Sequence, residues 1–80
     1  MSDLRVCVSG ACGKMGSEVV RTIAESPGVI LTGAVDVSHV GEEIGKIAGT
    51  SDQVKIQVSL GEVLAEGNVD VVVEFTSHQS

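Results

Sequence analysis

The chain opens with a short apolar run and then changes to a helical spacing of apolar residues. Residues 4–9 form a run that Gly10 stops, which predicts a central strand buried on both faces. Between residues 15 and 24, apolar side chains recur at steps of three and four, which predicts a helix with one apolar face. Pro27 and Gly28 end this helix. The apolar face comprises Met15, Val19, Val20, Ile23 and Ala24.

The remaining pattern predicts three more strands. Residues 29–36 form an apolar run that ends in a carboxylate, at what we expect to be the C-terminal tip of a strand. Residues 37–52 mix glycines with a few apolar positions and predict a loop with one short helical turn. Residues 54–58 alternate apolar and polar positions, which predicts an edge strand. A brief helix capped by Ser59 then leads into a fourth strand over residues 69–75.

Strands that alternate with helices in this way are typical of an α/β fold with a parallel sheet. Right-handed crossovers restrict its topology, and the natural strand order is 3-2-1-4. We therefore expect a Rossmann-like, three-layer fold with a four-stranded parallel sheet. A chain of 80 residues supports a single small core, so the whole of residues 1–80 is one domain.

Composition excludes several classes of function. With a net charge of −6 and five scattered Lys and Arg residues, the chain lacks the basic patch that nucleic-acid binding requires. No apolar run is long enough for a membrane span, and no leader is apparent, so we expect a cytoplasmic protein. Cys7 and Cys12 lie too far apart in an extended strand for a disulfide. No cluster of metal ligands is present either.

Residues 10–16 read G-A-C-G-K-M-G and join the first strand to the first helix. Gly10 permits a tight turn, Gly13 lets the backbone approach a pyrophosphate, and Gly16 lets the helix pack closely on the sheet. A strand before the loop and a helix after it favour a dinucleotide site over a turn that binds nothing.

Asp36 lies twenty residues beyond Gly16, at the end of the second strand. A carboxylate there can accept hydrogen bonds from both hydroxyls of an adenosine ribose, which favours NADH. Lys14, in the first helical turn, either faces a phosphate or is simply solvated. If Lys14 reaches the 2′-phosphate, NADPH binds as well, so both cofactors remain open.

Four blocks of sequence together resemble dihydrodipicolinate reductase. The loop pattern G-A-x-G-[KR]-M-G, combined with an acidic-Phe-Thr strand end at this distance, is fairly specific for that family. The blocks are Val8 to Gly16, Gly33 to Asp36, Gly41 to Gly45 and Asp70 to Thr76, and they cover nearly the whole chain.

The resemblance implies the reduction of a cyclic imine to tetrahydrodipicolinate by NADH or NADPH, in lysine and diaminopimelate biosynthesis. It also implies a homotetrameric whole protein. The implied pyrophosphate site comprises Gly10, Ala11, Cys12, Gly13, Lys14 and Met15. Asp36 takes the place of the family's ribose-binding acidic residue, and Phe75 and Thr76 are expected near the nicotinamide.

Three departures from the family limit these expectations. Glu74 replaces the aspartate that more commonly precedes Phe-Thr in the family. Val37 stands where some relatives place an arginine for the 2′-phosphate. The family's substrate domain has no counterpart here, so we expect an incomplete NAD(P)-binding domain without catalytic residues of its own. His39 and His78 do not fill that vacancy, because isolated loop histidines are usually solvated. The alternatives are a stand-alone Rossmann-like nucleotide-binding module without catalysis, or a domain that has lost ligand binding.

Overall fold

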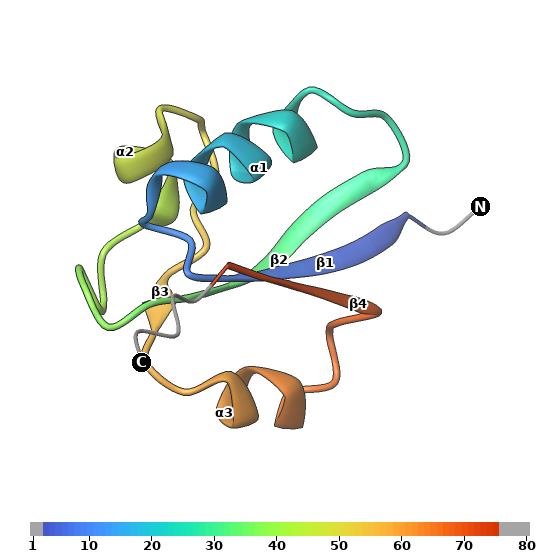
Figure 1. Cartoon of the computed structure of the whole chain (residues 1–80). Helices are drawn as coiled ribbons and strands as arrows, with labels where there is room; N and C mark the ends of the chain where they lie inside the picture. The colour runs from blue at the N-terminus through green and yellow to red at the C-terminus, as the bar shows by residue number, and fades with distance from the viewer. Residues whose placement is uncertain (1–2, 76–80) are drawn as a thin grey trace.

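The computed structural model describes residues 3–75, which form three layers with a sheet in the middle (Figure 1). Helices α1 and α2 cover one face of the sheet and α3 covers the other. The four strands are all parallel, in the order β3-β2-β1-β4, which confirms the predicted fold. The elements are β1 (Leu4–Ser9), α1 (Lys14–Ala24), β2 (Val29–Val35), α2 (Ile44–Ala48), β3 (Ile56–Gln57), α3 (Leu60–Ala65) and β4 (Val71–Glu74).

Two of the predicted strands are shorter than expected. β4 covers Val71–Glu74 instead of residues 69–75, although backbone hydrogen bonds to β1 continue at both of its ends, from the N–H of Asp70 to the carbonyl of Arg5 and from the N–H of Phe75 to the carbonyl of Ser9. β3 lies at the edge of the sheet as predicted, but it has only two residues instead of five. The N–H and C=O groups of Ile56 both bond to the chain at Gly41 and Glu42, at 2.8 Å each. The loop before α2 therefore pairs with β3, which accounts for the short strand.

Helix α1 buries Val20 and Ile23 of the predicted apolar face and half-buries Val19, but the first and last positions of that face are exposed. Its buried residues are Gly16, Val20 and Ile23, whereas Met15 is 62% exposed and Ala24 is also exposed. The prediction was wrong at these two positions because Gly16, which carries no apolar side chain, is the residue that rests against the strand-to-helix turn. Close packing at a glycine thus fixes which side of α1 faces the core.

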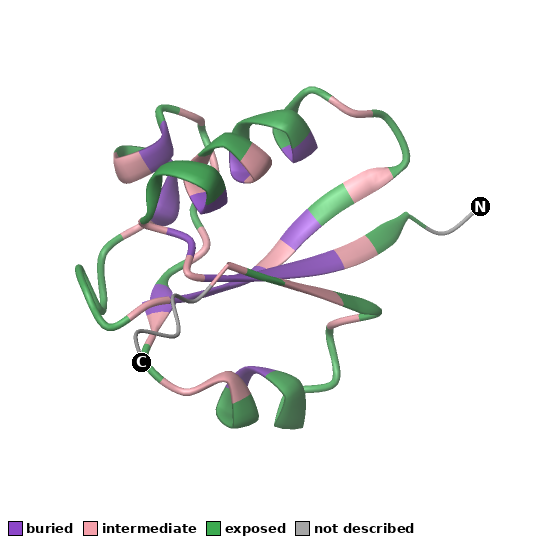
Figure 2. Cartoon of the chain, viewed as in Figure 1, coloured by how far each residue is buried: buried purple, intermediate pink, exposed green. Residues whose placement is uncertain are grey.

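Most of the core lies between the sheet and the α1–α2 layer, as the buried strand centres and inner helix faces in Figure 2 show. The residues of β1 from Val6 to Ser9 are buried, which confirms the predicted central strand. A smaller cluster of Cys7, Val35 and Val63 lies beneath α3. Ser59 is the N-cap of α3, and its hydroxyl accepts the N–H of Glu62, so the predicted cap is confirmed.

Candidate functional site

A cavity of about 600 Å³ opens at the C-terminal ends of the central strands. After β1 the chain enters α1 on one face of the sheet, whereas the helix that leads to β4 lies on the other face (Figure 1). The strand order therefore reverses between β1 and β4, and open parallel sheets bind ligands at such a switch point. The cavity is lined by Ser9, Gly10, Gly13, Val35, Asp36, Val37, Val58, Leu60, Glu74 and Phe75.

The glycine-rich loop is held against the end of β2. Gly10 has a φ of 82°, a left-handed conformation that glycine adopts without steric cost. The N–H groups of Gly10 and Ala11 both donate to the carbonyl of Val35, at 2.7 and 3.1 Å, and the N–H of Gly13 donates to the carbonyl of Gly10 at 3.1 Å. These loop amides are already engaged, so they shape the site and are not available to a ligand.

The unengaged donors lie one step further along the chain, at the start of α1. Within residues 3–75, the N–H groups of Lys14, Met15 and Gly16 donate to no protein acceptor. Gly13 is the N-cap and supplies no capping side chain, and the first turn carries no acidic residue. The positive end of the helix dipole is therefore uncompensated there, as an anion-binding helix terminus requires.

Gly13 leaves room for a ligand at this helix terminus. Its φ of −73° is ordinary for any residue, and a Cβ added there would lie 3.4 Å from the carbonyl oxygen of Gly10, an ordinary contact. The protein's own packing thus does not demand glycine at this position. The absent side chain instead keeps open the approach from the cavity to the start of α1.

Asp36 directly follows β2, which confirms its predicted position at the end of that strand, and its side chain lines the cavity. Its carboxylate accepts two backbone hydrogen bonds, from the N–H of Cys12 to Oδ2 at 2.9 Å and from the N–H of Ser38 to Oδ1 at 3.0 Å. The Cys12 thiol donates to the carbonyl of Ser38 at 3.5 Å. Burial, and then the charges of Asp36 and Glu42, raise the pKa of this thiol, so it is protonated at neutral pH and is a poor nucleophile.

The predicted site residues fall into three groups. Gly10, Gly13, Asp36 and Phe75 line the cavity, and the N–H of Phe75 donates to the carbonyl of Ser9 at 2.9 Å. Ala11 is buried and Cys12 half-buried, so these two support the loop and do not line the cavity. Lys14 and Met15 are exposed at the start of α1. Thr76 lies outside the described residues.

Sequence reasoning missed several residues that line the cavity. Ser9 and Glu74 end neighbouring parallel strands, and that position is a signal that could have identified them. Val58 and Leu60 supply an apolar wall together with Val37, which the family resemblance had already placed near the 2′-phosphate. No local pattern marks Val58 and Leu60, because Val58 lies in the connection from β3 to α3 and Leu60 begins α3, so both reach the cavity only through the path of this connection.

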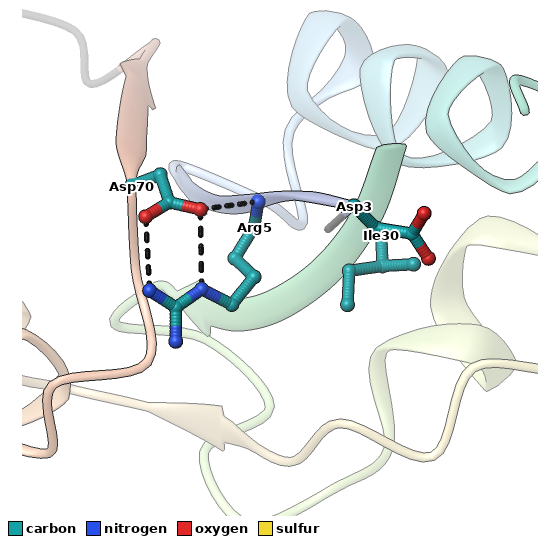
Figure 3. Close-up of a pocket in the computed structure, with 4 residues that line it drawn as sticks. All are labelled: Asp3, Arg5, Ile30 and Asp70. Carbon is teal, nitrogen blue, oxygen red and sulfur yellow. Dashed lines mark hydrogen bonds and ion pairs between the residues drawn. The ribbon is translucent and has the colours of Figure 1, made fainter. Parts of the chain in front are cut away.

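A second cavity, of about 520 Å³, lies at the opposite end of the strands and is lined by Asp3, Arg5, Ile30 and Asp70 (Figure 3). The Arg5 guanidinium donates two hydrogen bonds to the Asp70 carboxylate, of 3.1 and 2.9 Å, and the backbone N–H of Arg5 donates to the same carboxylate at 2.9 Å. The single cation of this cavity is therefore already neutralised, and the contact joins β1 to β4 instead of forming a ligand site.

The surface histidine and the described helices offer no other kind of site within residues 3–75. His39 lies in the loop after β2 with its Nδ1 3.1 Å from a Glu42 carboxylate oxygen, on the surface. No three His, Cys, Asp or Glu side chains in this part of the chain lie close enough together to hold a metal ion. None of the described helices is long and apolar enough to cross a membrane.

A parallel sheet in this order, with a glycine-rich loop opening α1 at the switch point, defines a Rossmann-like domain of the dinucleotide-binding class. Residues 4–80 match the family described as dihydrodipicolinate reductase, N-terminus, and the chain belongs to that family.

Individual relatives agree with the family match. A protein of Trichormus variabilis named 4-hydroxy-tetrahydrodipicolinate reductase is 41% identical to this chain, over 99% of this chain and 32% of the relative. The other two relatives carry the same name. In Desulfitobacterium hafniense the identity is 42%, over 100% of this chain and 31% of the relative. In an Anaeromyxobacter species the identity is 40%, over 96% of this chain and 29% of the relative. The chain thus spans about a third of the length of the curated relatives it matches.

Proposed function

We propose that this domain binds a nicotinamide dinucleotide in the cavity at the C-terminal ends of β1, β2 and β4. The observation that carries the proposal is the start of α1, where three unengaged N–H groups meet an uncapped, glycine-lined opening at the switch point of the sheet. Such a helix terminus suits a pyrophosphate, because it supplies hydrogen-bond donors and a positive dipole end without needing a cationic side chain. Family membership supports the same ligand.

The residues around the cavity suit the parts of such a cofactor. The amides of Lys14 and Met15 would donate to the pyrophosphate, in the space that Gly13 leaves open. Asp36 would accept the hydroxyls of the adenosine ribose. Phe75 and Thr76 would lie on the nicotinamide side. The cofactor, when bound, supplies the hydride; this chain's share is to bind and orient the cofactor.

For the whole protein, we propose the reaction that the relatives' name describes. A domain that contains the substrate site would present a dihydrodipicolinate-type cyclic imine to the reduced cofactor, in the biosynthesis of lysine and diaminopimelate. No residue of the described chain is assigned to the chemical step. A homotetrameric assembly and a cytoplasmic location belong to the same proposal.

Charge favours NADH over NADPH within this proposal. The charged residues that line the cavity are Asp36 and Glu74, both acidic, and no Lys or Arg is among its described lining residues. The 2′-phosphate of NADPH would approach Asp36, and a dianionic phosphate beside a carboxylate is repelled. Val37, which is exposed at the cavity, supplies no compensating cation.

Calorimetric titration of the folded chain with NADH and NADPH tests this proposal. We expect heat and saturation with NADH, and weaker binding with NADPH that weakens further as salt is removed, because screening of the repulsion is lost. Absence of heat with both cofactors, from protein that circular dichroism shows to be folded, would refute the binding function. Tighter binding of NADPH would refute the assigned preference alone.

A further inference from the structure

We propose that Asp36 is a positioning residue that ties the glycine-rich loop to the segment after β2 before any ligand is bound. One carboxylate oxygen accepts the N–H of Cys12, 24 positions earlier in the chain, and the other accepts the N–H of Ser38. Asp36 thus joins two loops that border the same cavity. This role is distinct from the ribose contact assigned above, because it operates in the free protein.

The hydrogen bonds of the loop show why a side chain is needed at this place. The N–H groups of Gly10 and Ala11 donate to the carbonyl of Val35, and that of Gly13 donates to the carbonyl of Gly10. Three of the four amides of residues 10–13 therefore have backbone acceptors. Cys12 is half-buried, and the only acceptor for its N–H among the described residues is the carboxylate of Asp36. A buried amide without an acceptor is costly, and a hydrogen bond to a charged acceptor is stronger than one to a carbonyl.

The same carboxylate can still serve a ligand. Each oxygen of an ionised carboxylate offers about two acceptor positions, and each oxygen of Asp36 uses one of them on a backbone N–H. The carboxylate therefore keeps acceptor capacity for the hydroxyl groups of a ribose while it holds the two backbone N–H groups. This last step rests on the proposed function, whereas the tie between the loops does not.

Nuclear magnetic resonance of the ¹⁵N-labelled chain, without cofactor, tests the tie directly. An amide proton that is bonded to a carboxylate changes its resonance when that carboxylate is protonated. We expect the Cys12 and Ser38 amide protons to shift together on acidification, with one shared midpoint. In Asp36→Asn both shifts should disappear, because the side chain no longer ionises. The side-chain amide keeps one acceptor oxygen in place of two, so hydrogen exchange should accelerate by about tenfold or more at Cys12 or at Ser38.

A matched control distinguishes the effect of Asp36 on these amides from the effects of neighbouring ionisable groups. The Cys12 thiol and Glu42 lie close to this amide, Glu74 lines the same cavity, and Lys14 begins the adjacent helix. Glu42→Gln removes one of these carboxylates and the same unit of charge as Asp36→Asn. We expect Glu42→Gln to leave the shared midpoint at Cys12 and Ser38 in place.

The inference is overturned if the Cys12 amide proton shows no pH-dependent shift, if its midpoint differs from that of Ser38, or if the shift is lost in Glu42→Gln. These criteria need only the wild-type chain and the control, so they hold even where Asp36→Asn fails to fold. Because no cofactor is present, failure of the tie and failure of dinucleotide binding are observed separately: the first by resonance shifts and the second by calorimetry.

Discussion

Gly16 packs so tightly against Gly10 that a Cβ added to Gly16 would overlap the Gly10 carbonyl oxygen and lie 2.8 Å from its carbon. Both atoms belong to the backbone and cannot rotate away. We therefore expect Gly16→Ala to destabilise the fold by about 3 kcal/mol, because overpacking outweighs the better helix propensity of alanine. Urea unfolding followed by circular dichroism measures the change.

Gly61→Ala is the matched control for Gly16→Ala. Gly61 also lies inside a helix, but its added Cβ would come no closer than 3.7 Å to the Ser59 hydroxyl oxygen. Alanine should stabilise α3 there by up to about 1 kcal/mol. Equal effects of the two substitutions would contradict the close contact between Gly16 and Gly10.

Gly13→Val should abolish dinucleotide binding and leave the fold intact. The φ of Gly13 is ordinary, and an added Cβ meets no atom closer than 3.4 Å, so neither the backbone conformation nor the space at the Cβ position demands glycine. That side chain would extend into the approach to the amides of Lys14 and Met15. Circular dichroism should be nearly unchanged while calorimetric heat with NADH disappears. Retained affinity for NADH would show that the pyrophosphate binds elsewhere.

Arg5 and Asp70 make the stability of the fold depend on acidity. The Arg5 guanidinium and backbone N–H hold the pKa of Asp70 at about 2, below its ordinary value. A carboxyl whose pKa is lower in the folded state stabilises that state above its unfolded pKa, and the contribution fades as pH falls through the folded pKa. Between about pH 5 and pH 2, the free energy of unfolding should therefore fall more steeply in the wild type than in Asp70→Asn.

Asp3→Asn is the control for this comparison, since Asp3 lines the same cavity and makes no ion pair among the described residues (Figure 3). It should keep the wild-type pH dependence. Parallel stability curves for wild type and Asp70→Asn would contradict a stabilising role. The pair is about 40% exposed at Arg5 and 36% at Asp70, so added salt should weaken its effect.

Gly33→Ala should loosen the packing of α3 on the sheet. A Cβ at Gly33 would lie 2.7 Å from Val63 Cγ1 and 3.0 Å from the Cys7 sulfur, within the cluster beneath α3. We expect a loss of about 1–3 kcal/mol in the free energy of unfolding. The double substitution Gly33→Ala with Val63→Ala relieves the overlap, so its loss should be smaller than the sum of the two single losses. Strict additivity would count against direct contact.

The sequence alone determined the architecture and the loop. Apolar runs that end at Gly10 and Asp36 require buried parallel strands, and these constraints together predict the observed strand order. The left-handed conformation of Gly10 and the tight packing of Gly16 also follow from local requirements. Such features are predictable because they depend on a few neighbouring residues.

Tertiary structure decided which groups the site actually offers. The amides of residues 10–13 donate to Val35, Asp36 and Gly10, so the unengaged donors belong to the first three residues of α1, Lys14, Met15 and Gly16. Likewise, the exposure of Met15 and the apolar wall at Val58 depend on how helices rest on the sheet. A pattern of residues fixes which elements form, but hydrogen bonds between segments more than twenty residues apart exist only once those elements have packed together.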